Sequence, residues 1–177
     1  MELDSLEAIK IFCYKYGKKP LIIDTNVLLL LFIGIFNKDF IERCSLTSGK
    51  YSPDDFETLK QVIRYFKSEV IITPYILTEV SNLSKTNIKD PYFHIYFAKI
   101  TDILRHYQEH HITLENLLKI DFKLLSRFGF PDMSIVEVAK QIGAVVLTDE
   151  INLHEQLLYK KIPVMKFSYI TTKKFLT

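Results

Sequence analysis

The sequence predicts an α/β domain built around a mainly parallel β-sheet. Three short apolar runs, at residues 21–23, 70–72 and 144–147, are rich in branched side chains, which is typical of strands buried on both faces. Longer segments with apolar residues at helical spacing separate these runs. Strands that alternate with helices form parallel sheets with right-handed crossovers. The 177 residues suit one domain, and 48% hydrophobic with 25% charged residues is an ordinary globular balance.

Local start and stop signals place the elements of the first half. Gly17 ends an N-terminal helix, and Ser52-Pro53 and Thr73-Pro74 are typical helix starts. The apolar run after Asp24 is predicted to be a helix that is interrupted near Gly34. The expected order is a helix over residues 1–16, a strand at 21–23, a helix to 36, a loop or short helix with a basic edge at 37–52, a helix from 53 to about 68, a strand at 70–72 and a helix from 74 to about 84.

The second half is expected to begin with a helical insertion at residues 85–111, where polar and aromatic residues predict one amphipathic helix from 91 to about 110. Gly129 and Gly143 end two later helices, and Pro163 places the last strand at a sheet edge. The remaining elements are a brief strand or extended link at 112–114, helices at 115–127 and 131–142, a strand at 144–147, a helix near 152–159 and a strand at 162–165. No linker or repeat is visible, so residues 1–177 are expected to form one domain.

Acidic residues stand where several of these elements begin or end. Asp24 follows the first strand, and Asp149 with Glu150 follows the strand at 144–147. Asp132 lies in the first turn of a helix. In a parallel α/β domain the N-termini of helices lie at the same edge as the carboxyl ends of strands, where ligands bind. Taken singly, Asp24 could be a helix cap, Asp132 a first-turn acid, and Asp149 and Glu150 turn residues.

Glu79 is harder to explain as a structural residue. It lies three residues after Ile76 and four before Leu83, so it belongs to the apolar stripe of its helix. A carboxylate on a buried face costs several kcal/mol unless it is paired or holds a metal. No basic residue in these segments is placed to neutralise the acids. Carboxylate oxygens favour Mg²⁺ or Mn²⁺, and such a metal can assist attack on a phosphodiester.

Four segments carry these acids: residues 22–28 (Ile-Ile-Asp-Thr-Asn-Val-Leu), 73–83, 130–135 and 146–150. In this order they resemble the four motifs of the PIN-domain nucleases, especially the single-domain bacterial and archaeal members related to toxin–antitoxin ribonucleases. The resemblance covers residues 21 to about 165. It implies a three-layer α/β/α sandwich around a mainly parallel sheet of strand order 3-2-1-4-5.

The resemblance also implies a Mg²⁺- or Mn²⁺-dependent endoribonuclease that hydrolyses phosphodiester bonds of single-stranded or looped RNA. Many PIN proteins are toxins of toxin–antitoxin pairs, and many dimerise. Besides RNA, the partners implied are therefore an antitoxin protein and a second copy of the chain.

Carried over by position, Asp24, Glu79 and Asp132 match the first three acids of the family. Thr25 and Asn26 match positions that orient the first acid and its metal-bound water. The fourth motif is Thr148-Asp149-Glu150, and the common family pattern Thr-x-Asp points to Glu150. Because Asp149 is shorter and closer to the strand end, it is the first choice here. The expected catalytic residues are Asp24, Glu79, Asp132 and Asp149; the expected metal ligands are Asp24, Asp132, Asp149 and Glu150; Thr25, Asn26 and Thr148 support them.

Other readings of the sequence remain open. The stronger alternative is a non-catalytic PIN-like domain that binds RNA or protein, against which the intact acid set argues. An aspartyl-phosphate enzyme of the haloacid-dehalogenase type would have a second aspartate two residues after Asp24, where Asn26 stands. His106 and His110 have a helical spacing that can bind a transition metal, and His111 is adjacent, but a third ligand is not evident.

The net charge of +2 is too small to indicate nucleic-acid binding without a local basic patch. The cations expected near the acids are Lys38, Arg43, Lys50, Lys85 and Arg127. Cys13 and Cys44 form no C-x-x-C pair and are expected to be reduced thiols. The acidic N-terminus lacks a signal-peptide pattern, and the run at 27–36 is too short for a membrane span. We therefore expect a soluble cytoplasmic protein with no membrane partner.

Overall fold

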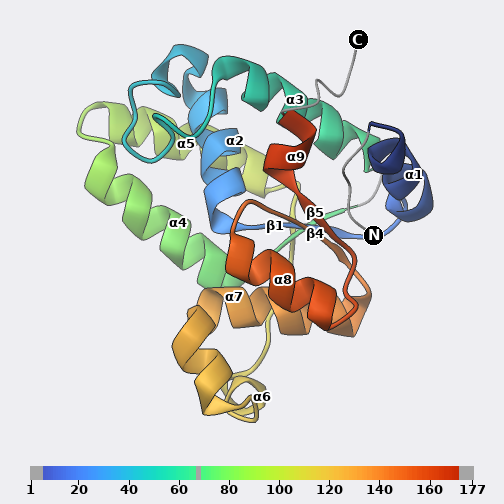
Figure 1. Ribbon diagram of the computed structural model, residues 1–177. Helices are drawn as coiled ribbons and strands as arrows, with labels where there is room; N and C mark the ends of the chain where they lie inside the picture. Colours follow the sequence, from blue (N-terminus) through green and yellow to red (C-terminus); the bar gives the residue numbers. More distant parts are fainter. Residues whose placement is uncertain (1–5, 67–68, 172–177) are drawn as a thin grey trace.

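A parallel β-sheet lies at the centre of the structure, a computed structural model that describes residues 6–66 and 69–171 (Figure 1). Its five strands are β1 (Leu21–Ile23), β2 (Val70–Ile72), β3 (Gln108–Glu109), β4 (Val145–Thr148) and β5 (Val164–Lys166). Their order is β3-β2-β1-β4-β5, and every neighbouring pair is parallel. The fold class and the expected strand order are confirmed. Leu21 pairs with Val70 on one side and with Val145 on the other, so the three apolar runs form the middle of the sheet.

Helices cover both faces of this sheet. In the view of Figure 1, α7 and α8 lie below the sheet, and α2 lies above it with α3 and α5. The helical elements are α1 (Leu6–Tyr16), α2 (Thr25–Phe36), η1 (Lys38–Phe40), α3 (Pro53–Tyr65), α4 (Pro74–Asn87), α5 (Tyr92–Leu104), α6 (Leu114–Leu117), α7 (Phe122–Ile142), α8 (Ile151–Tyr159) and α9 (Phe167–Thr171). In the described ranges, none of these helices combines the length and apolar character needed to cross a bilayer.

The predicted helix starts are confirmed by their caps. The Ser52 hydroxyl accepts from the backbone of Asp55, and the Asp55 carboxylate accepts from the Ser52 backbone, which is a full capping box. Thr73 caps α4, and Asp24 caps α2. Two predicted boundaries differ modestly, because α3 ends at Tyr65 and α4 continues to Asn87. Residues 1–5 and 67–68 of the predicted helices lie outside the described residues.

The expected single helix over 91–110 is wrong in its second half. Helix α5 ends at Leu104, and residues 108–109 instead pair with β2 as an edge strand. Of the two alternatives for 112–114, the strand is wrong, because the edge strand is at 108–109; residues 112–113 are the extended link, and α6 begins at Leu114. The helix expected over 115–127 is wrong only in its continuity, because α6 ends at Leu117 and α7 begins at Phe122. The break at Gly129 is confirmed, since its φ of 75° interrupts α7 with a kink.

The expected interruption of α2 at Gly34 is also wrong, because the helix continues to Phe36. Gly34 is instead the place where another element packs closely. A Cβ atom at this position would lie 2.3 Å from Cδ2 of Phe56, a buried ring of α3. The residues of α2 from Val27 to Ile33 are at most 3% exposed, so the helix is buried almost all round. Glycine at this site therefore serves packing.

We predict that Gly34→Ala lowers the free energy of unfolding by about 1–3 kcal/mol, because overpacking exceeds the gain in helix propensity. Denaturant unfolding measures the change. The Phe56→Leu substitution shrinks the opposing side chain. Adding Gly34→Ala to Phe56→Leu should therefore lower the free energy of unfolding by less than adding it to the wild type does. If Gly34→Ala proved more stable than the wild type, the close contact would not exist in solution.

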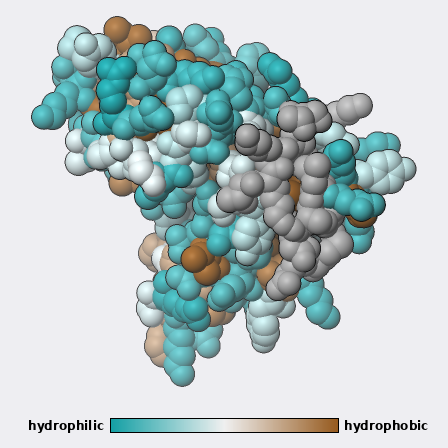
Figure 2. All heavy atoms as spheres, turned by 45° about the horizontal axis from the view of Figure 1, so that its top comes forward, coloured by the Kyte–Doolittle hydropathy of each residue, from teal (hydrophilic) through white to brown (hydrophobic). Residues whose placement is uncertain are grey.

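The face of the molecule shown in Figure 2 is mostly hydrophilic, and its hydrophobic atoms form small separate patches. Scattered apolar residues are normal on a protein surface.

Candidate functional site

Asp24 is buried at the carboxyl end of β1 and is held by three hydrogen bonds. Its Oδ1 accepts from the backbone N–H of Val27 at 3.0 Å, as a helix cap does. Its Oδ2 accepts from the Thr148 hydroxyl and, at 3.2 Å, from the backbone N–H of Asp149. Burial raises the pKa of Asp24 to about 6, although the three hydrogen bonds act in the opposite direction. The carboxylate is therefore rigidly placed and costly to ionise.

Asp132 provides the clearest electrostatic signature of the site. It begins the part of α7 that follows the kink, and its side chain is half-buried. Burial, and after it the charges of three other acids, raises the pKa of Asp132 to about 7. These acids are Asp24, Glu79 and Glu150. Acids from four separate segments therefore act on one another at the same edge of the sheet, as the sequence predicts.

Glu79 reaches this edge from α4 and is tied to the start of α2. The Thr25 hydroxyl donates to Glu79 Oε2 over 2.5 Å. The resemblance assigns Thr25 to orienting the first acid, but here its hydroxyl orients the second. The neighbouring Asn26 is half-buried on α2. The sequence predicts a buried Glu79 from its place on the apolar stripe. In the structure its carboxylate is half-buried and has the Thr25 hydroxyl as a partner.

Asp149 and Glu150 have different surroundings. Asp149 Oδ1 accepts from the backbone N–H of Ser168 at the start of α9, at 2.7 Å. Burial, and then the charge of Asp149 together with a hydrogen bond to it, raises the pKa of the Tyr51 hydroxyl. Asp149 is therefore held by the backbone of Ser168 and its charge raises the pKa of Asp24, whereas the charge of Glu150 raises the pKa of Asp132. Because the Asp149 carboxylate already accepts from Ser168, we take Glu150, whose carboxylate accepts only from the exposed Asn152 amide among the hydrogen bonds of the described residues, as the better candidate for the fourth acid.

The Thr148 hydroxyl links the first acid to the fourth segment. It is fully buried, donates to Asp24 Oδ2 and accepts from the backbone N–H of Glu150 at 2.9 Å. A hydroxyl can donate and accept at once, so one side chain fixes both groups. This agrees with the supporting position expected for Thr148.

Two features that support the site, a contact between Thr73 and Ser134 and the side chain of Tyr51, are not predicted by the sequence. The Thr73 hydroxyl lies 3.0 Å from Ser134 Oγ, both side chains are fully buried, and Ser134 donates to the carbonyl of Pro131 at 2.7 Å. This contact joins the N-terminal turns of α4 and of the second part of α7, which carry Glu79 and Asp132. Tyr51 is the other. The sequence marks Thr73 as a helix cap, but neither its contact with Ser134 nor that of Tyr51 with Asp149 has a local signal, because the partners are distant along the chain.

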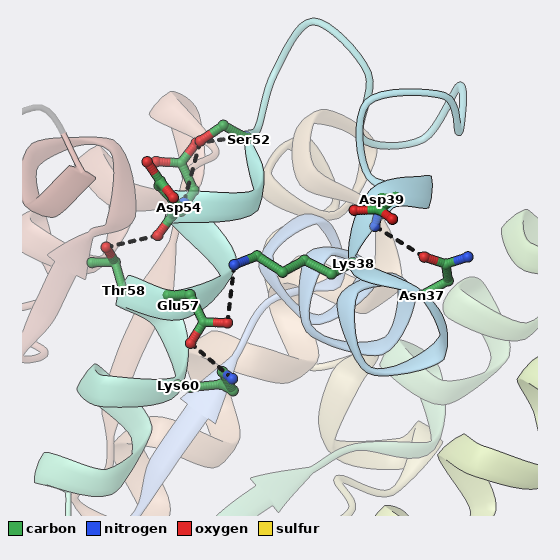
Figure 3. Close-up of polar contacts among 9 residues, drawn as sticks. Asn37, Lys38, Asp39, Ser52, Asp54, Glu57, Thr58 and Lys60 are labelled. Atoms are coloured by element: carbon green, nitrogen blue, oxygen red, sulfur yellow. Dashed lines mark hydrogen bonds and ion pairs between the residues drawn. The ribbon is translucent and has the colours of Figure 1, made fainter.

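Within the part of the chain that the structure describes, the acid cluster has no ion pair with a cation. Among the ion pairs within residues 6–66 and 69–171, none includes any of Asp24, Glu79, Asp132 and Glu150. Lys38, which was expected near the acids, binds Glu57 at 3.3 Å, and Glu57 also binds Lys60 at 2.8 Å (Figure 3). Lys38 is thus directed toward α3.

Of the other expected cations, Arg127 is connected to the site. Its guanidinium donates to Asn152 Oδ1 at 3.4 Å, and the Asn152 amide lies 3.5 Å from Glu150 Oε1. Arg43 donates to the carbonyl of Asp39. Lys50 and Lys85 are exposed. Among the five expected cations, only Arg127 has a hydrogen bond that leads toward the acids within the described residues.

The acids fit a divalent cation by their chemistry, because the donors are all carboxylates and the like charges raise the pKa of Asp132. In the described part of the chain, however, no three acidic, histidine or cysteine side chains are close enough to form a metal-binding group. The same finding covers His106 and His110. These two do not share a helix, since α5 ends at Leu104.

Sequence comparison assigns no family. No protein-family model matches the chain, and no curated protein is significantly similar to it. The interpretation of the site therefore rests on its motifs and its geometry.

Proposed function

We propose that this protein is a Mg²⁺- or Mn²⁺-dependent endoribonuclease of the PIN type that hydrolyses single-stranded or looped RNA. The observation that carries the proposal is that Asp24, Glu79, Asp132 and Glu150 come from separate segments to one edge of the sheet, where Asp24 is bonded to Thr148 and burial with the other acids' charges raises the pKa of Asp132. Like charges gathered at a ligand-binding edge, with none of them in an ion pair among residues 6–66 and 69–171, are typical of a site that binds a divalent metal.

The roles of the residues follow from their contacts. Asp24, Asp132 and Glu150 would hold the metal, which when bound neutralises charge at the scissile phosphate and acidifies a water molecule. Thr148 and the backbone of Val27 fix the orientation of Asp24.

Glu79, oriented by the Thr25 hydroxyl, accepts the proton of the attacking water through its other oxygen. Asp149 stabilises the edge through Ser168 and Tyr51. By analogy with the family, the products carry 5′-phosphate and 3′-hydroxyl ends.

One observation favours a second candidate, a non-catalytic PIN-like domain that binds RNA or protein. The carboxylates are not arranged as a ready metal-binding group within the described ranges. A toxin role, an antitoxin partner, a homodimer and a cytoplasmic location remain predictions from the resemblance and the sequence.

A cleavage assay on a mixed pool of single-stranded RNA separates the two candidates. We expect the purified protein to cut RNA with Mg²⁺ or Mn²⁺, to lose this activity with EDTA, and to regain it when metal is restored. The identically purified Asp24→Asn protein, in which asparagine retains the helix cap, should be inactive. Asp102→Asn changes an exposed aspartate of α5 and should cut at the wild-type rate. Equal cleavage by Asp24→Asn would assign the activity to a contaminant, and no cleavage by any preparation would favour the binding domain.

A further inference from the structure

Two aromatic rings stack beside the acidic residues. The rings of Tyr75 and Phe130 have centroids 6.2 Å apart and an interplanar angle of 24°. Tyr75 lies in the first turn of α4, four residues before Glu79, so the two side chains share a face of the helix. Phe130 lies at the kink of α7, two residues before Asp132. The pair therefore spans the two helices that carry these acids.

The outer side of this pair is open. Phe130 is 44% exposed and packs on Tyr75, whereas Tyr75 is half-buried and packs against the core. The core therefore does not require the Phe130 ring. An exposed aromatic face beside a polar site is apolar surface that a flat ligand can cover.

Two cations lie in the part of α7 that precedes the kink, and one of them, Arg127, is linked to the acids through Asn152. Arg127 precedes Phe130 by three residues, and its guanidinium lies over the Phe128 ring with 5.1 Å to the centroid. Lys123 precedes Arg127 by four residues in the same helical stretch, so both exposed side chains share a face. A π-face next to cations matches a nucleotide, since the base can stack and the phosphate can bind the cation.

We propose that Tyr75 and Phe130 form a stacking platform for one base of a single-stranded RNA, next to the phosphate that is cut. This inference rests on the proposed function, because the acids define where that phosphate lies. Stacking tolerates any base, so the platform selects unpaired nucleotides and not a sequence. A base in an RNA duplex is already stacked on its neighbours, so it cannot stack on the Phe130 ring. The platform thus accounts for a preference for single-stranded or looped RNA.

Binding of a single-stranded RNA that contains 2-aminopurine tests the platform, with all proteins in the Asp132→Asn background to prevent cleavage. We expect quenched 2-aminopurine fluorescence on binding, and about 5- to 100-fold weaker binding by Phe130→Ala. Phe130→Trp should bind as tightly as the parent. Phe122→Ala is the matched control, because it removes an exposed ring of α7 far from the acids in sequence. Circular dichroism verifies that each variant is folded.

An abasic RNA strand of the same length separates stacking of the bases from contacts between the protein and the sugar-phosphate backbone. The loss caused by Phe130→Ala should vanish on this strand, whereas an equal loss on both strands would overturn the platform. Ring-dependent binding without any cleavage by the wild type would reject the nuclease proposal and support the platform. Cleavage by the wild type with unchanged binding by Phe130→Ala would reject the platform alone. Absence of RNA binding would overturn both.

Discussion

Replacing Asp132 with asparagine is expected to abolish cleavage and, at the same time, to stabilise the protein in the absence of metal. The loss should be at least about 10²-fold, because the side chain is proposed to hold the catalytic metal. The gain in stability arises because asparagine has no charge, so it avoids both the cost of burying a carboxylate and the repulsion by the neighbouring acids. At pH 8 and without metal we expect the free energy of unfolding to rise by about 1–2 kcal/mol, a value reduced to allow for solvent screening of a half-buried group.

The difference between the two proteins should depend on pH in a defined direction. The pKa of Asp132 is raised from 3.8 to about 7 in the folded protein, so between these values the folded state holds a proton that the unfolded state releases. The stabilisation by this proton is complete below pH 4 and is lost as the pH rises through 7. The asparagine variant lacks this dependence, so its relative advantage should grow over that range.

Denaturant unfolding in EDTA at pH 5 and pH 8, together with the RNA cleavage assay, measures both effects. Asp102→Asn is the matched control, and neither its stability nor its activity should change appreciably. A destabilised Asp132→Asn protein at pH 8 would mean that Asp132 is a structural acid with an unrecognised partner. Wild-type cleavage by this variant would remove Asp132 from the site.

Thr148→Val is expected to impair both the fold and the activity while leaving the volume of the side chain unchanged. The substitution removes the hydrogen bond to Asp24 Oδ2 and leaves the backbone N–H of Glu150 without its acceptor. Losing buried hydrogen bonds should lower the free energy of unfolding by about 1–3 kcal/mol. Misplacing a carboxylate that is proposed to bind metal should lower cleavage about 10- to 100-fold.

Thr148→Ser separates the hydroxyl from the rest of the side chain. Serine retains both hydrogen bonds, so its cleavage rate should stay close to that of the wild type even if the missing methyl group lowers stability. The hydrogen bond from Thr148 lowers the pKa of Asp24. The pH profile of Thr148→Val should therefore shift toward higher pH, whereas that of Thr148→Ser should not. Equal activity of the valine and serine variants would show that the hydroxyl does not position Asp24.

Much of the frame was predictable because its causes are local. The strands at 21–23 and 70–72 are continuous apolar runs, and the helices after Ser52 and Thr73 begin at caps that the sequence displays. The region from 104 to 121 was not predictable in the same way. Gln108 and Glu109 are exposed polar residues that have no strand pattern, and they extend only because β2 offers a free edge. The predicted interruption of α2 at Gly34 was wrong for a similar reason, since the residue that requires glycine there, Phe56, is on another helix.

The sequence by itself determined the parallel sheet and the acids at its carboxyl edge, because apolar periodicity, caps and parallel topology are sufficient to place them. Tertiary structure alone decided which atoms those acids contact. Thr25 donates to Glu79, and Asp149 accepts from Ser168, leaving Glu150 to act on Asp132. Hydrogen bonds and charge interactions between distant segments depend on how helices pack at the edge of the sheet. Packing distances of a few ångströms are not encoded in any local pattern.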